Sequence, residues 1–133
     1  MKIVFWGDLP QPSGFGRIAR ECARRLAGRG HAIEAISMAY TAGPTPSEPY
    51  YTWSVAPPRD LWNMSTDIIN NLRPEVLVSC QDFPYHHTLY WGCKIDFSQM
   101  AWIFITPIDG TPIAQDWVDL VDCADGAMVI SKF

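Results

Sequence analysis

Two kinds of hydrophobic pattern alternate along the chain. Runs of consecutive apolar residues, which are typical of strands buried on both faces of a sheet, predict the strands 3–7, 32–38, 75–80, 101–106 and 127–130. Apolar residues spaced three and four apart, which are typical of amphipathic helices, predict the helices 16–27, 61–72 and 113–123. A run with strand propensity at 50–55, inside a proline-rich stretch, adds a short strand near an edge of the sheet.

Strands that alternate with helices and are joined by short turns predict right-handed crossovers and a parallel sheet. We therefore expect an α/β fold: one Rossmann-like, doubly wound domain of five or six strands, with helices on both faces in three layers. The first helix should pack Ile18, Cys22 and Leu26 inward, with Ala19 and Ala23 beside them. The last helix should bury its own apolar side, which consists of Ile113, Trp117, Leu120 and Val121.

Residues 12–17 form a glycine-containing loop between the first strand and the first helix. Gly14 and Gly16 can take positive φ and carry no Cβ. The amides and the dipole at the start of the following helix favour a phosphate above the sheet. Arg17, Arg20 and Arg24 share the polar side of this helix, which is interpreted as a solvated face. Among them Arg17, at the loop itself, has the better case for touching such a phosphate. Paired glycines also occur in turns that bind nothing.

Three aspartates follow predicted strands and should lie at the carboxyl edge of the sheet, where open α/β sheets bind ligands. They are Asp8, Asp82 and Asp109. Asp109 either acts as a base or hydrogen-bond acceptor toward a substrate hydroxyl, or caps the helix that starts near Pro112. Asp82 has the same two interpretations.

Composition excludes several classes of function. A length of 133 residues fits one domain. The net charge of −4 and the absence of a basic run argue against nucleic acid. The chain has neither an 18-residue apolar stretch nor a signal-peptide pattern, so we expect no transmembrane segment and a cytoplasmic location.

Cysteine and histidine spacing predicts no metal site. The four cysteines lack a C-x-x-C pair and are interpreted as reduced thiols. His86 and His87 are adjacent, so in a helix or a strand they point in different directions.

The chain resembles the N-terminal domain of retaining glycosyltransferases of the GT-B architecture. Four stretches carry the resemblance, and together they span nearly the whole chain: 13–17, 26–33, 107–110 with Trp117, and 124–133. The resemblance implies a nucleotide-sugar donor, whose diphosphate lies against Gly14, Phe15 and Gly16, and a sugar or lipid acceptor. Asp109 stands where this family often has a histidine near the transferred sugar, and we expect acceptor contacts at Asp8 and Asp82.

The resemblance also implies a second, nucleotide-binding domain after Phe133. We therefore expect residues 1–133 to form the acceptor-side half, inactive alone, that pairs with that domain or forms a homo-oligomer. One alternative is a non-catalytic binding or assembly domain. Another is an NAD(P)-dependent oxidoreductase domain, because Gly14-x-Gly16-x-x-Ala19 fits a dinucleotide fingerprint. Against it, six residues separate Gly7 from Gly14, and no acidic residue closes the second strand.

Overall fold

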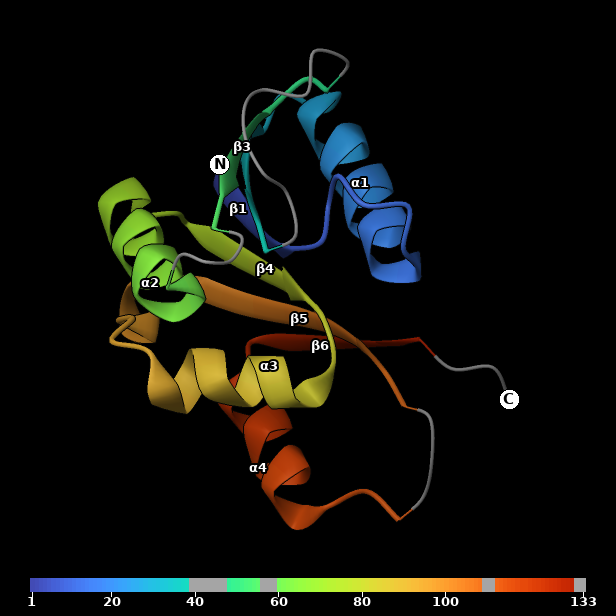
Figure 1. Cartoon of the computed structure of the whole chain (residues 1–133), viewed down its shortest axis with the longest axis vertical. Coiled ribbons are helices and arrows are strands. Elements are labelled where there is room, and N and C mark those ends of the chain that lie inside the picture. The colour runs from blue at the N-terminus through green and yellow to red at the C-terminus, as the bar shows by residue number, and fades with distance from the viewer. Residues whose placement is uncertain (39–47, 56–59, 109–111, 131–133) are drawn as a thin grey trace.

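The computed structural model describes residues 1–38, 48–55, 60–108 and 112–130. They form a six-stranded sheet in which every neighbouring pair is parallel, in the order β3-β2-β1-β4-β5-β6 (Figure 1). The strands are β1 (Lys2–Gly7), β2 (Ala32–Ser37), β3 (Tyr51–Ser54), β4 (Val76–Cys80), β5 (Ala101–Pro107) and β6 (Gly126–Ile130). The predicted doubly wound parallel α/β fold is therefore confirmed.

Helices cover both faces of this sheet. They are α1 (Gly14–Ala27), α2 (Leu61–Leu72), α3 (Phe83–His87) and α4 (Gln115–Cys123), with a π-helical turn, η1 (Thr88–Gly92), and a 3-10 turn, η2 (Phe97–Gln99). α1 packs on one face, and the other helices pack on the opposite face (Figure 1). The chain leaves β1 toward β2 and returns to the sheet at β4, so the strand order reverses between β1 and β4.

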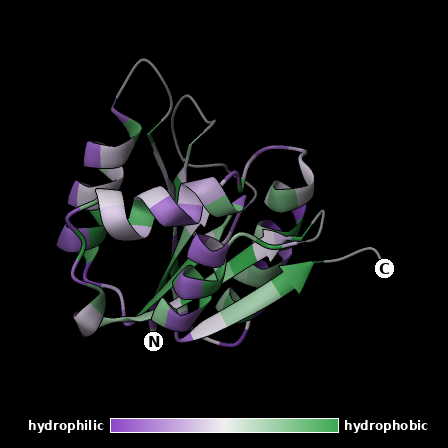
Figure 2. Ribbon diagram, turned by 90° about the horizontal axis from the view of Figure 1, so that it is seen from below, coloured by the Kyte–Doolittle hydropathy of each residue, from purple (hydrophilic) through white to green (hydrophobic). Residues whose placement is uncertain are grey.

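Each face of the sheet has its own hydrophobic core, which explains why the strands are apolar throughout (Figure 2). In β1, Val4 and Trp6 point to the side of α2, whereas Ile3 and Phe5 point to the side of α1. All four are at most 3% exposed. Because a strand buried on both faces shows no alternation, its apolar run was a reliable signal.

Helix α1 approaches the sheet through its small residues. Ala19 and Ala23 are fully buried, while Ile18, Cys22 and Leu26 are half-buried around them. The helix begins at Gly14, inside the predicted loop. Gly14 and Gly16 therefore lie in the first helical turn and do not use the positive φ open to them, whereas Gly7 and Gly30 have positive φ.

Helix α4 differs from its prediction. It starts at Gln115, and Ala114 occupies its N-cap position. Leu120 is buried, but Ile113 and Val121 are 37% and 39% exposed. The predicted inner face is too wide because α4 packs at the margin of the sheet and meets little beyond α3.

The segment 83–99, for which the sequence predicts no element, folds into α3, η1 and η2 through aromatic packing. Phe83 stacks on Trp117 of α4, with ring centroids 4.5 Å apart. Tyr90 stacks on Trp102 of β5, with centroids 5.1 Å apart. These contacts join residues far apart in sequence, so a local hydrophobic pattern does not predict them.

A buried polar network fastens α3 to β4 and β5. The indole N–H of Trp102 donates to Ser79 Oγ over 2.9 Å, and Ser79 Oγ lies 3.0 Å from His86 Nδ1. His86 Nε2 faces the carbonyl of Ile105 at 3.3 Å. Because a carbonyl only accepts, Nε2 carries the proton, and Nδ1 accepts from the serine hydroxyl. This arrangement requires a neutral imidazole.

We expect acid to destabilise the fold through His86. Burial lowers its pKa from 6.5 to about 4, and the carbonyls of Ile105 and Gln81 oppose the shift only in part. Between pH 6.5 and about 4, His86 is protonated in the unfolded chain but stays neutral in the folded chain. The free energy of unfolding should therefore fall by about 3 kcal/mol as the pH drops through this window. Denaturant unfolding of His86→Gln should lose most of this dependence between pH 6.5 and 5, whereas His87→Gln should keep it. An unchanged profile in His86→Gln would refute the assignment.

Apolar side chains remain exposed on β6 and α4. Met128 and Val129 are 56% and 49% exposed, and Val118 is 42% exposed. The expected homo-oligomer or paired domain stays a prediction. No helix in the described ranges is long and apolar enough to cross a membrane.

Candidate functional site

A depression of about 330 Å³ lies where the strand order reverses, at the carboxyl ends of the strands. In a doubly wound sheet this is where ligands bind. Gly14, Phe15 and Ile18 of α1 form one wall. Asp82 after β4, with Pro107 and Ile130 at the ends of β5 and β6, forms the other. The predicted neighbours Gly14, Phe15 and Asp82 are thus brought together.

The first turn of α1 presents two free backbone donors to this depression. Ser13 caps the helix, and its hydroxyl accepts from the Gly16 amide over 3.0 Å. The Arg17 amide donates to the Ser13 carbonyl. Within the described part of the chain, the amides of Gly14 and Phe15 have no acceptor. Two unpaired N–H groups at a helix N-terminus suit an anionic oxygen.

Gly16 shapes the loop and does not itself line the depression. A Cβ on Gly16 would lie 2.5 Å from the carbonyl oxygen of Asp8 and closer still to that of Gln11. A Cβ on Gly14, in contrast, would meet nothing within 4 Å. The two glycines of the motif therefore have different physical roles: Gly16 permits close packing of the loop, and Gly14 leaves the space above α1 open.

Gly7 and Cys80 end the paired strands β1 and β4, next to the segments that line the depression. Gly7 ends β1 with φ of +156°, and a Cβ there would lie 2.6 Å from the carbonyl oxygen of Cys80. The Cys80 thiol lies 3.7 Å from the Phe15 carbonyl, to which it donates. Burial raises the pKa of this thiol to about 12, and the charges of Cys22 and Asp8 add to the shift. Cys80 is therefore a protonated anchor for α1 and not a nucleophile.

The aspartates occupy different positions. Asp82 is exposed, lines the depression and stands at the N-cap of α3, but its side chain makes no capping hydrogen bond. Its carboxylate is therefore available to a ligand. Asp8 is half-buried in the turn after β1, where its carbonyl accepts from the Gln11 amide.

Two predicted site residues remain, Arg17 and Asp109. Arg17 is exposed and does not line the depression. Asp109 lies outside the described residues, although Pro107, two residues earlier, forms part of the wall. The carboxylate of Asp82 is thus the one charged group among the lining residues described.

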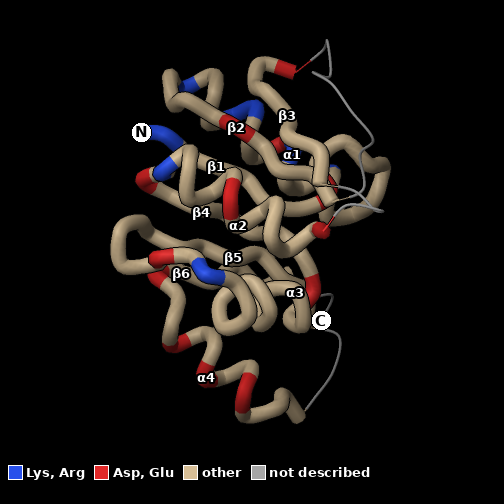
Figure 3. Tube along the Cα trace, turned by 60° about the vertical axis from the view of Figure 1, so that its left-hand side comes forward, with Lys and Arg blue, Asp and Glu red and all other residues tan. Residues whose placement is uncertain are grey.

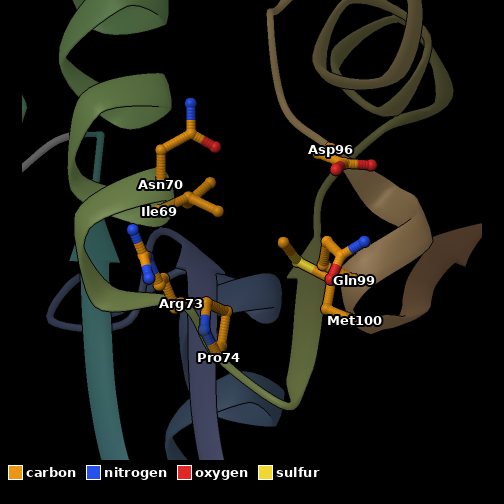
Figure 4. Close-up of a pocket in the computed structure, with 7 residues that line it drawn as sticks. All are labelled: Ile69, Asn70, Arg73, Pro74, Asp96, Gln99 and Met100. Atoms are coloured by element: carbon orange, nitrogen blue, oxygen red, sulfur yellow. The ribbon is translucent and has the colours of Figure 1, made fainter.

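A second depression, of about 350 Å³, lies at the opposite end of the sheet (Figure 4). It separates the end of α2, with Asn70 and Arg73, from Asp96 and Gln99 near η2. This is the amino edge of β4 and β5, away from the reversal of strand order. It does not belong to the candidate site.

Charged residues give no sign of a metal centre. Acidic side chains repeat along the exposed surface of α4, at Asp116, Asp119 and Asp122 (Figure 3). Among the residues that the structure describes, no three His, Cys, Asp or Glu side chains gather to hold a metal ion.

Comparisons with models of known protein families and with curated proteins find no match for this chain. Sequence reasoning missed Ile130 as a lining residue of the depression, and it missed the close approach of Gly7 and Cys80 beside it. Gly7 was detectable, because a glycine that ends a buried strand often marks a close backbone approach. Cys80 and Ile130 offer no such signal, since both simply continue apolar runs.

Proposed function

We propose that this chain is the N-terminal, acceptor-side domain of a GT-B glycosyltransferase, which transfers a sugar from a nucleotide-sugar donor to a sugar or lipid acceptor. The observation that carries the proposal is the pair of free amides, Gly14 and Phe15, above the reversal point of a parallel sheet. Such amides hydrogen-bond phosphate oxygens without a metal ion. The resemblance in residues 13–17 and 107–110 supports a diphosphate as the occupant.

Asp82 has a distinct role in this proposal. Asp82 lines the same depression as the two amides, and its carboxylate makes no capping hydrogen bond. It can therefore accept a hydrogen bond from a sugar hydroxyl. The same charge opposes a diphosphate by Coulomb repulsion. Asp109 remains the candidate for the catalytic carboxylate by resemblance alone.

The chain alone should bind nucleotide sugars weakly and transfer nothing, since most nucleotide contacts belong to the second domain of this architecture. Calorimetry with UDP-glucose and GDP-mannose should give measurable dissociation constants of about 1 mM. Asp82→Asn should tighten this binding by about twofold to fivefold, because one negative charge leaves the depression. Asp67→Asn is the matched control, since Asp67 is exposed on α2 and away from the site.

The alternatives give different results in the same titrations. The strand order is also that of dinucleotide-binding domains, so selective, micromolar binding of NAD would favour an oxidoreductase instead. Failure of all three ligands to bind would favour a non-catalytic domain. Unchanged binding in Asp82→Asn would remove Asp82 from the site.

A further inference from the structure

A polar cavity of about 300 Å³ lies on the other side of the β1–α1 loop, between α1 and β3. Leu9 and Pro10 of the loop form one wall. Arg20 and Arg24 of α1 form the second, and Glu48, Tyr50 and Thr52 complete the cavity. It shares no lining residue with the depression at the carboxyl edge.

Arg20 brings an unneutralised positive charge to this cavity. Its Nη1 donates to the carbonyls of Leu9 and Gln11, over 3.2 and 3.5 Å. Within the described ranges it forms no ion pair with a carboxylate. A guanidinium has five N–H donors, so Nε and Nη2 remain for a ligand. The helical pattern placed Arg20 on a solvent face, but its long side chain reaches back over the loop.

The acidic residue in the cavity is already paired. Both carboxylate oxygens of Glu48 lie 2.7 Å from the guanidinium of Arg24, and the Glu48 side chain is only 6% exposed. This two-point contact neutralises Glu48. The net charge of the cavity is therefore that of Arg20.

A buried hydroxyl in the cavity wall has no partner. Thr52 is 1% exposed, and its Oγ1 has no hydrogen bond in the part of the chain that is described. An unpaired buried hydroxyl is unfavourable, and valine would fill the same position on β3 without that cost. Tyr50 adds a second hydroxyl. Burial, followed by the charge of Glu48, raises its pKa, so this phenol stays protonated, and it donates its one proton to the Glu48 carboxylate.

We propose that this cavity is a binding site for a phosphate monoester, held by the guanidinium of Arg20 and the hydroxyl of Thr52. The guanidinium supplies paired donors that match phosphate oxygens. The volume exceeds that of the anion alone and accommodates a small organic group. The site is independent of the proposed transferase activity, because it lies outside the depression at the carboxyl edge.

The test is a titration of the whole 133-residue chain with glycerol 2-phosphate and inorganic phosphate in phosphate-free buffer, followed by amide NMR. Saturable shifts at residues 50–52 and at the Arg20 Nε–H group are expected for both probes below about 20 mM. Tighter binding of glycerol 2-phosphate supports the monoester as the ligand. Tighter binding of inorganic phosphate, or no saturable shift at these groups, would overturn the proposal.

Two variants separate binding from folding. Thr52→Val should weaken glycerol 2-phosphate binding by about threefold or more, while the melting temperature of the free protein stays equal or rises. Arg20→Met should weaken it by about tenfold. Arg29→Met, which removes an exposed charge beyond the end of α1, should leave binding unchanged. Equal affinity of Thr52→Val and the native chain, or equal losses from Arg20→Met and Arg29→Met, would refute the site.

Discussion

Replacing Gly16 with alanine is expected to lower the free energy of unfolding by about 2 to 4 kcal/mol. The new Cβ would overlap the carbonyl oxygens of Asp8 and Gln11. Both are backbone atoms, so no side-chain rotation relieves the overlap, and the loop must move away from α1. Chemical denaturation followed by circular dichroism measures the loss.

Gly14→Ala is the matched control for this prediction. Gly14 lies two residues earlier in the same helical turn, and a Cβ there meets nothing within 4 Å. Alanine favours the helix, so this variant should be neutral or more stable by about 0.5 kcal/mol. Similar losses in the two variants would show that the loop does not have the packing described for Gly16.

Gly7→Ala should have an effect as large, at a different point of the site. The substitution places a Cβ 2.6 Å from the carbonyl oxygen of Cys80, and it forces alanine to φ of +156°. Overpacking and backbone strain together should cost about 3 kcal/mol or more. Because β1 and β4 pair at this point, the strands would separate where the depression begins.

The Gly7 prediction has its own control at Gly30, the other glycine with positive φ among the described residues. Gly30, at φ of +85°, has open space around its missing Cβ. Gly30→Ala therefore suffers strain without overpacking and should cost only about 1 kcal/mol. Denaturation midpoints of the two variants distinguish the causes. If Gly7→Ala were no less stable than Gly30→Ala, the close approach of β1 and β4 would be wrong.

Elements of this fold that a local sequence pattern encodes were predictable, and those that depend on distant contacts were not. Strands such as β1 and β4 are buried on both faces, so their apolar runs identify them directly. The helix α3 and the turn η1 depend on Phe83, His86 and Tyr90 contacting distant strands and helices. A local pattern does not encode such contacts. The predicted buried face of α4 was too wide for a related reason. The exposure of each of its side chains depends on where the helix lies beside the sheet.

The candidate site was predictable in position but not in detail. Strand ends and the glycine loop indicated the neighbourhood of Gly14, Phe15 and Asp82. The sequence did not reveal that Gly16 serves loop packing, since a glycine gives the same signal in either role. Nor did it show that Arg20 leaves the solvent face to hold the loop, because helical periodicity locates Cα atoms and not the ends of long side chains.

If the backbone amide of Gly14 binds a diphosphate, Gly14→Pro should have a lower affinity for the ligand than Gly14→Ala. Gly14 is the first residue of α1, a position that tolerates proline. Ser13 already has the extended backbone, φ of −77° and ψ of 165°, that a following proline requires. Both variants add a Cβ, but only proline removes the N–H donor.

NMR titration with UDP-glucose measures the affinity of each variant under conditions in which both are fully folded. Gly14→Pro should bind about tenfold more weakly than Gly14→Ala, as expected for the loss of a hydrogen bond to a charged group. Uridine, which has no phosphate, should not distinguish the two variants. Equal affinities of the variants for UDP-glucose would contradict the proposed diphosphate site.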